Sequence, residues 1–288
     1  MCRFLAYLGK PIVLDKLLYQ PKNSLVHQSY HAQERKEPLN GDGFGVGFYV
    51  PEIDPAPALF VSTTPAWNNR NLRYNAPKIR SHCIFAHVRA ASYGEVSEMN
   101  CHPFHYGKFL FMHNGQIGGF KIVKRKLRQR LSDELYNWIQ GTTDSEHFFA
   151  LFLNNLLKKG KQDEYRAPDM ANAMEETFAE LMELLGESGI DEPSYMNVAI
   201  TNGKYIVATR CTLGPSAEAA TLYHSEGSRF ECDDGVCRMV QAGPAKHAVL
   251  VVSEKLTEAK ADWRETPKNH LVIVNENLSV ALRPIKMS

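Results

Sequence analysis

Short apolar runs flanked by Gly, Asn, Pro and other turn-forming residues fill the first part of the chain. They cover residues 4–8, 44–50, 58–61, 83–88 and 109–112. Runs of this length beside turn-forming residues predict β-strands. The pattern then changes, because apolar positions recur at helical spacing over residues 122–139, 148–157 and 170–185. These three segments predict helices.

Beyond Pro193 the strand pattern returns, over residues 195–201, 205–209, 221–224, 248–253, 270–274 and 278–283. Asn202-Gly203 predicts a hairpin with a type I′ turn, since both residues tolerate positive φ. The proline-rich residues 51–57 predict a turn between strands. Strands, then helices, then strands favour an α+β layered architecture over alternating βαβ units. No low-complexity linker or repeat divides the chain, so we expect a single domain over residues 2–288.

The ends of the second predicted helix also carry signals. Thr142, Thr143, Asp144 or Ser145 could cap its start, and Gly160 is placed to end it.

Composition excludes several classes of protein. The 288 residues are 44% hydrophobic and 23% charged, as in folded globular proteins. Lys plus Arg minus Asp plus Glu is 33 − 32 = +1, so no global field favours nucleic acid or an anionic membrane. No apolar run approaches the roughly 18 to 20 residues of a membrane span, and no signal peptide is recognised. We therefore expect a cytoplasmic protein.

The cysteines predict reduced thiols and no metal centre. Six cysteines without a signal peptide are too few for a secreted disulfide framework. Cys232 and Cys237 lie close in sequence, but no second Cys or His pair completes a zinc motif. We expect no metal and no cofactor.

The amino terminus offers an unusual nucleophile. A small residue at position 2 favours removal of Met1, which would leave Cys2 as the first residue. Its free α-amine would have an ordinary pKa of about 7.7 to 8.0 and could act as the base beside its own thiol. The alternative is a buried structural cysteine in an edge strand.

Residues 40–48 carry glycines at four alternate positions. They do not fit a dinucleotide-binding motif, because the spacing differs and no helical pattern follows. Alternate glycines clear one face of a strand for a neighbouring backbone or for a ligand, and the pattern leaves both possibilities open.

Three polar positions follow predicted strands or precede a helix. Arg89 ends an apolar strand and could hold a carboxylate or pair with a structural acid. Asn114 and Gly115 could form an oxyanion hole or an ordinary turn. Asp144 could bind an ammonium group or cap a helix.

Together and in this order, these residues resemble the class II glutamine amidotransferases, whose glutaminase domain belongs to the N-terminal-nucleophile hydrolases. The similarity runs from Cys2 to about Glu146, and the motif-bearing part spans residues 2–150. The opening residues 1–7, residues 40–49 and residues 86–92 look most like the stand-alone branch, which includes the ergothioneine-pathway γ-glutamyl amidase and the fungal glutathione-degradation subunit. One departure is Arg3, where the common glutaminase start has glycine.

The resemblance implies a fold and a set of roles. The fold would be a four-layer αββα sandwich. Cys2 would be the nucleophile, and Asn114 with the Gly115 N–H would stabilise the oxyanion. The substrate would be bound by three residues: Arg89 at its α-carboxylate, Asp144 at its α-ammonium and His102 in the pocket wall.

The expected reaction is hydrolysis of a γ-glutamyl amide through a γ-glutamyl thioester, with glutamine, glutathione or another γ-glutamyl amine as substrate. The alternative is a glutaminase that delivers ammonia to a separate partner subunit. Six cations within residues 121–130 could bind nucleic acid, although a solvated helix face balanced by Asp133 and Glu134 is the simpler interpretation. A catalytically inactive interaction protein is the third alternative. Contacts to the leaving group are unassigned, with residues 67–77 and 214–234 as candidate loops.

Overall fold

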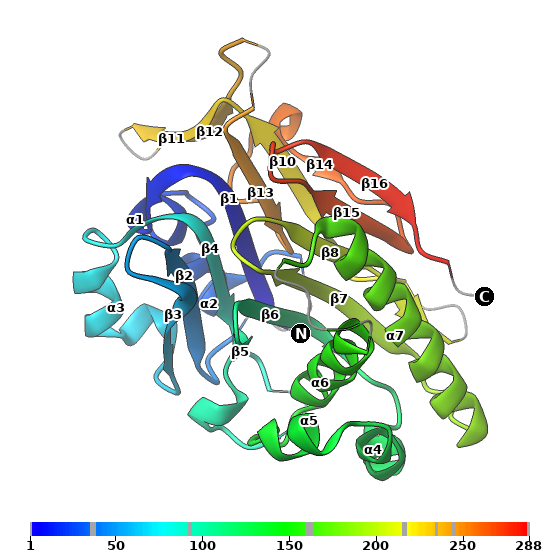
Figure 1. The fold of residues 1–288 in the computed structure, drawn as a ribbon. Helices are drawn as coiled ribbons and strands as arrows, with labels where there is room; N and C mark the ends of the chain where they lie inside the picture. Colours follow the sequence, from blue (N-terminus) through cyan, green and yellow to red (C-terminus); the bar gives the residue numbers. More distant parts are fainter. Residues whose placement is uncertain are drawn as a thin grey trace.

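The computed structural model describes residues 2–34, 39–91, 94–158, 160, 164–214, 218–233, 236–243 and 246–286. Two sheets of seven strands each form the centre of the molecule (Figure 1). The first contains, in spatial order, β14 (Arg264–Glu265), β10 (Tyr223–Gly227), β13 (Ala248–Val252), β1 (Arg3–Val13), β4 (Arg80–Val88), β2 (Phe44–Val50) and β3 (Asp54–Ser62). Strands from both ends of the chain therefore share one sheet.

The second sheet is built mainly from the middle and the end of the chain. Its strands are, in order, β16 (Val280–Pro284), β15 (His270–Val274), β8 (Ile206–Arg210), β7 (Ser194–Thr201), β6 (Phe109–Gln116) and β5 (Phe104–Tyr106), with β9 (Thr212–Leu213) paired to β7. Among the described residues, the strand pairings in both sheets are antiparallel.

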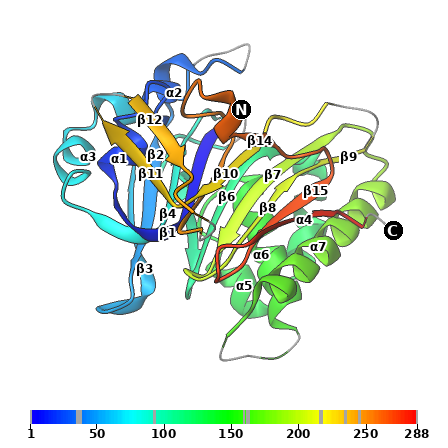
Figure 2. The same ribbon diagram turned by 90° about the horizontal axis from the view of Figure 1, so that it is seen from above.

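Outer layers cover both sheets (Figure 2). The second sheet is covered by α4 (Phe120–Gln129), α5 (Asp133–Trp138), α6 (Asp144–Leu157) and α7 (Ala167–Glu187). Beyond the first sheet lie α1 (Asp15–Leu18), α2 (Leu25–His31), α3 (Arg70–Asn75) and the hairpin of β11 (Arg229–Asp233) and β12 (Val236–Val240). Short 3₁₀ turns occupy η1 (Ala66–Asn68), η2 (Glu98–Asn100) and η3 (Lys260–Asp262). The predicted α+β fold, a four-layer αββα sandwich, is confirmed.

Clusters of buried apolar side chains hold the layers together. Between the sheets, Phe4 of β1 and Phe85 of β4 pack in one cluster with Met112 of β6. On the helical side of the second sheet, Phe111 stacks on Phe149 of α6 with ring centroids 4.8 Å apart. Burial of apolar surface on both faces of each sheet explains why so many strands read as nearly continuous apolar runs.

The single helix predicted over residues 122–139 is wrong, because the chain forms α4 and α5 instead. Asn154 of α6 supplies the reason. Its Nδ2 donates to the Arg130 carbonyl at 3.1 Å and its Oδ1 accepts from Ser132 N at 3.1 Å. Ser132 then caps α5 by accepting from Leu135 N. The Asn154 side chain thereby makes the hydrogen bonds that these backbone groups would otherwise make within a continuous helix, so the helix can end here.

Other local predictions are confirmed in part. Thr143 is the residue that caps α6, accepting from Glu146 N at 3.2 Å. The predicted proline-rich turn is shorter than expected, because β3 begins at Asp54; as an edge strand it tolerates prolines. Residues 67–77, predicted as a loop, contain α3, which is too short to show a helical period.

The hairpin at Asn202-Gly203 is confirmed, but its type I′ turn is not. Thr201 pairs with Ile206, so four residues form the loop, and of the two only Gly203 has positive φ. The Asn202 Oδ1 accepts from Lys204 N and Tyr205 N, each at 3.2 Å. This side-chain turn replaces the two-residue backbone turn.

The expectation of reduced thiols is wrong for one pair. Cys232 and Cys237 form a disulfide that joins β11 to β12. They are directly opposed in the hairpin, with Cα atoms 4.0 Å apart. The sequence does not predict this hairpin, because its pattern over residues 214–234 indicates a candidate loop. Residues 215–217 and 234 of that segment lie outside the described residues. The other four cysteines are free and buried.

Candidate active site

Cys2 lies at the start of β1, between two neighbouring segments of chain. Its side chain is buried, and the backbone of Arg3 pairs with Val88 at the end of β4. The Ala90 N–H donates to Cys2 Sγ at 3.4 Å, and the thiol lies 3.5 Å from the Ala90 carbonyl. The thiol therefore contacts the residue that directly follows Arg89.

Arg89 is buried just beyond β4. Its Nη1 donates to the Glu95 carbonyl at 3.0 Å, while its backbone N–H donates to Gly43 O at 2.8 Å. Buried guanidinium groups keep their charge and bind carboxylates in a bidentate manner. The structure thus places Arg89 directly before the residue that the Cys2 thiol contacts.

A short chain of contacts links Arg89 to the start of α6. The Glu95 carbonyl that accepts from Arg89 also accepts from Asn100 Nδ2 at 2.9 Å. Asn100 in turn donates to Thr142 Oγ1 at 3.1 Å and accepts from Thr142 N at 2.9 Å. Arg89 and Asp144, which are 55 positions apart, are therefore connected through one ordered segment.

Asp144 occupies the first turn of α6 and is buried. Its Oδ2 accepts from Ile117 N at 2.7 Å, and its Oδ1 accepts from Ser145 N at 2.9 Å. It does not cap the helix, since Thr143 does. Asp144 also lines a cavity of about 410 Å³ with Gln116 and Ile117. A carboxylate at a cavity wall can bind a substrate ammonium group.

Asn114 and Gly115 lie near the end of β6 and do not form a turn. Asn114 is fully buried, and neither atom of its amide has a hydrogen-bond partner in the described part of the chain. Gly115 has no room for a side chain, because a Cβ there would collide with the Tyr195 carbonyl oxygen. A buried amide without partners, on a rigid strand, is suited to bind a developing oxyanion.

His102 is buried beside His87, with the two imidazoles stacked at 4.2 Å. Burial lowers the pKa of His87 to about 3 and holds the pKa of His102 well below its usual range. Both rings are therefore neutral at pH 7, which allows them to stack without charge repulsion. The His87 ring also donates from Nε2 to the His113 carbonyl at 3.2 Å. His102 thus belongs to a buried group of rings with His87 and Phe104.

The alternate glycines of β2 make room for protein rather than for a ligand. A Cβ at Gly45 would collide with the His102 carbonyl oxygen, and one at Gly47 would lie 2.6 Å from Leu110 Cδ1. The cleared face therefore lets the segment that carries His102 lie directly against the sheet.

Two charged residues beside this site were not predicted to be functional. Arg3 and Glu254 are both buried, and Arg3 Nε lies 2.8 Å from Glu254 Oε2. They are separated by 251 positions, so no local pattern connects them.

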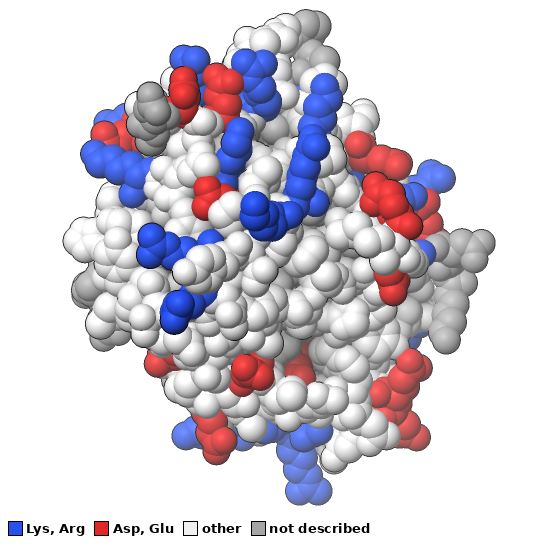
Figure 3. Space-filling view, turned by 90° about the vertical axis from the view of Figure 1, so that its left-hand side faces the viewer, with Lys and Arg blue, Asp and Glu red and all other residues white. Residues whose placement is uncertain are grey.

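The basic run of residues 121–130 lies on and just after α4, and several of its side chains have partners within the protein. Arg130 lies 2.8 Å from Glu183 of α7 and 3.5 Å from Glu180. The Arg128 guanidinium lies over the Tyr136 ring, 4.4 Å from its centroid. The acids that balance Arg130 thus come from α7, and not from Asp133 and Glu134 as expected. On another face, Figure 3 shows Lys and Arg gathered over the upper half with Asp and Glu around them.

No group of three or more His, Cys, Asp or Glu side chains is arranged to hold a metal ion among the described residues. Within the same residues, no helix is long and apolar enough to cross a membrane.

A four-layer sandwich with a cysteine at the start of a central strand defines an N-terminal-nucleophile hydrolase fold. The model of the family described as class II glutamine amidotransferases matches residues 20–286. The chain therefore belongs to the class II glutamine amidotransferases, an enzyme family, and the resemblance noted in the sequence is confirmed.

Individual relatives and a solved structure support the same family assignment. The chain is 41% identical over 302 residues to a Saccharomyces cerevisiae protein named "Probable glutamine amidotransferase DUG3", covering 99% of this chain and 84% of that one. It is 31% identical over 278 residues to the gamma-glutamyl-hercynylcysteine sulfoxide hydrolase of Mycolicibacterium smegmatis, covering 96% of each. A solved glutamine aminotransferase class-II domain protein from Silicibacter pomeroyi superimposes with a TM-score of 0.70 at 25% identity, covering 100% of each chain.

Proposed function

We propose that this enzyme hydrolyses a γ-glutamyl amide through a γ-glutamyl thioester on Cys2 and releases glutamate. One observation carries the proposal: the Cys2 thiol contacts Ala90, the residue directly after the buried Arg89. We infer from this contact that the Cys2 thiol and the Arg89 guanidinium act on the same bound substrate. The names of the yeast and mycobacterial relatives refer to glutamine and to a γ-glutamyl compound, which supports a γ-glutamyl amide bond as the target.

In the proposed reaction, removal of Met1 leaves the Cys2 α-amine free to take the thiol proton. The thiolate then attacks the γ-carbonyl carbon, and the Asn114 amide with the Gly115 N–H stabilises the oxyanion. The intermediate collapses to a thioester as the leaving amine takes up the proton. Water, deprotonated by the α-amine, then attacks the thioester and releases glutamate.

Substrate binding is assigned to three residues. Arg89 would hold the α-carboxylate and Asp144 the α-ammonium, while His102 shapes the wall. Gripping both charges of the glutamyl head fixes the reacting carbon near the thiol, which lowers the entropic part of the barrier. Glutamine, glutathione and other γ-glutamyl amines all carry this head group.

We further propose that residues 2–288 act as one domain, since β1, β10 and β13 from opposite ends of the chain lie in one sheet. A cytoplasmic location is also proposed and is tested by cell fractionation. Size exclusion with analysis of co-purifying protein tests whether a partner subunit is required. Release of glutamate by the purified chain alone would favour the hydrolase over an ammonia-delivering subunit.

The decisive experiment combines intact mass with covalent labelling. We expect the active protein to lack Met1 and to gain one adduct from a glutamine analogue that carries an electrophilic carbon. Cys2→Ala should abolish both glutamate release and labelling. Cys211→Ala is the matched control, because burial raises the pKa of Cys211 to about 12 and its thiol lies on the helical side of the second sheet. Active protein that retains Met1 would contradict the proposal.

A further inference from the structure

The first residue of a chain is normally its least ordered, because nothing precedes it to restrain it. An N-terminal nucleophile needs the opposite, since a displacement of about 1 Å can reduce a rate by about 100-fold. Something in the fold must therefore hold the start of β1.

One side of this terminus is held by backbone pairing with β4, as described above. The other side is held by the two residues that follow β13. Ser253 N donates to Phe4 O at 3.1 Å, and Phe4 N donates to Ser253 Oγ at 2.8 Å. These bonds fix residue 4, which leaves residues 2 and 3 to be fixed by other contacts.

Arg3 makes those contacts with a single guanidinium group. Its Nη1 donates to the carbonyl oxygen of Cys2 at 3.0 Å, while its Nε donates to Glu254 Oε2 at 2.8 Å. The side chain of Arg3 is 2% exposed and that of Glu254 is 1% exposed, so water does not compete for either bond. The backbone of the nucleophilic residue is thus connected to a buried carboxylate.

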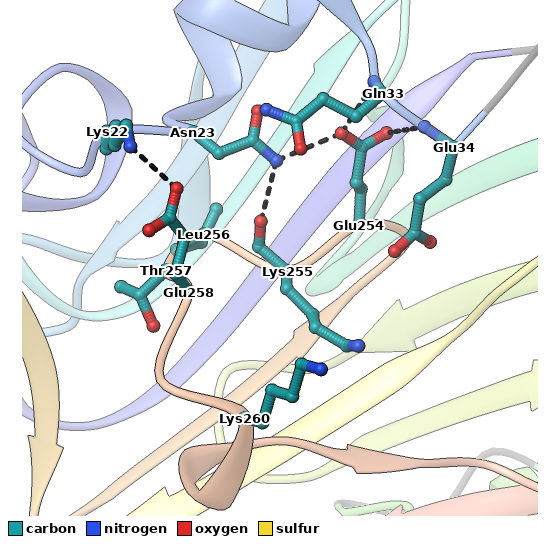
Figure 4. Close-up of a pocket in the computed structure, with 10 residues that line it drawn as sticks. All are labelled: Lys22, Asn23, Gln33, Glu34, Glu254, Lys255, Leu256, Thr257, Glu258 and Lys260. Atoms are coloured by element: carbon teal, nitrogen blue, oxygen red, sulfur yellow. Dashed lines mark hydrogen bonds and ion pairs between the residues drawn. The ribbon is translucent and has the colours of Figure 1, made fainter.

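Glu254 is itself held by hydrogen bonds from Asn23, Gln33 and Glu34 (Figure 4). Asn23 Nδ2 and Gln33 N each donate to its Oε1 at 2.9 Å, and Glu34 N donates to its Oε2 at 3.2 Å. Burial raises the pKa of Glu254, but these donors and Arg3 outweigh burial and lower it overall. The carboxylate therefore stays ionised and supports Arg3.

We propose that Arg3 and Glu254 are positioning residues that hold Cys2 in its reactive place. Neither residue touches the substrate. The inference rests on the proposed role of Cys2, and it explains why this chain carries arginine directly after its cysteine. Lysine could not replace it, because a single ammonium group cannot reproduce the forked geometry of a guanidinium.

The test compares kcat with KM. We expect Arg3→Lys and Glu254→Gln each to lower kcat by about 10- to 100-fold and to slow labelling of Cys2 to a similar degree. KM should change by less than about twofold, because Arg89 and Asp144 are unchanged. The double variant should lose less than the product of the single losses, as expected for two residues in direct contact.

Intact mass must first show that each variant still loses Met1. Arg210→Lys is the matched control: this arginine of β8, in the second sheet, also binds a glutamate, Glu265 of β14 at 2.6 Å, and backbone carbonyls. Its kcat should equal that of the unmodified enzyme. If Glu254→Gln fails to fold, Asn23→Ser removes one donor to Glu254 and should lower kcat several-fold.

Folded Arg3→Lys with unchanged kcat would overturn the inference, as would a rise in KM alone or a loss of melting temperature alone. Activity that survives in Cys2→Ala would instead overturn the proposed function. The two failures are therefore distinguishable.

Discussion

Asn114 and Asn197 lie opposite each other on adjacent strands, yet their side-chain amides differ in hydrogen bonding. Both residues are buried and paired in register between β6 and β7. Asn197 donates to the carbonyls of Ala220 and Thr221 at 3.0 and 3.1 Å and accepts from Cys211 N at 3.3 Å. Asn114 has no hydrogen-bond partner in the described part of the chain. The Asn197 amide is used by the fold, whereas the Asn114 amide is left for the oxyanion role proposed above.

This contrast predicts opposite effects of the same substitution. Asn114→Ala should lower kcat by about 100- to 1000-fold, as for other oxyanion donors, with little change in melting temperature. Asn197→Ala should leave Thr221 O and Cys211 N unpaired, while Ala220 O keeps its bond from Arg210 Nε, and should reduce the free energy of unfolding by about 1 to 3 kcal/mol or more. Steady-state kinetics and thermal unfolding of both variants test this. A stable, fully active Asn114→Ala would contradict the role assigned to Asn114.

The buried Arg89 predicts a defect in substrate binding. Arg89→Lys keeps the charge but loses the bidentate geometry, so KM for a γ-glutamyl substrate should rise by about 10- to 100-fold. A substrate analogue without the α-carboxylate should react equally slowly with both forms. If Arg89→Lys weakens reaction of that analogue to the same degree, the residue does not bind the carboxylate.

The neutral state of His87 predicts how stability depends on pH. Its pKa is about 3 in the folded protein because of burial, whereas an unfolded histidine has a pKa of about 6.5. Below pH 6.5 the unfolded state therefore takes up a proton that the folded state refuses. The free energy of unfolding is therefore unaffected by His87 above about pH 6.5. Below pH 6.5, His87 lowers the free energy of unfolding by about 1.4 kcal/mol per pH unit.

Denaturant unfolding at several pH values between 4 and 7 measures this slope. His87→Gln should make the slope shallower by about one proton, and substitution of the exposed His105 should not change it. An unchanged slope in His87→Gln would show that His87 is protonated in the folded state.

Two glycines predict opposite changes in stability. Gly45→Ala should destabilise the protein by about 1 to 3 kcal/mol or more and lower activity, because the new Cβ would displace the backbone of His102. Gly186→Ala in α7 meets nothing within 4 Å and should stabilise the helix by up to about 1 kcal/mol. Thermal unfolding tests both, and a neutral Gly45→Ala would contradict the close packing.

Local features of the sequence were sufficient for much of the fold. The strands at residues 44–50 and 270–274 were predicted with the bounds that β2 and β15 show. Hydrophobic periodicity depends only on neighbouring residues, and it was strong where both faces of a strand are buried. It failed where elements were too short for a period, as in α3, or where a distant side chain such as Asn154 ended a helix.

The family and the candidate residues Cys2, Arg89, Asn114 and Asp144 could also be named from the sequence, because their motifs are short and occur in a specific order. Tertiary structure alone decided which strands are neighbours, that Cys232 bonds to Cys237, and that the Asn114 amide has no hydrogen-bond partner among the described residues. It also brought Glu254 to Arg3 across 251 positions. Such contacts depend on the packing of the whole sandwich, and no local pattern in the chain encodes them.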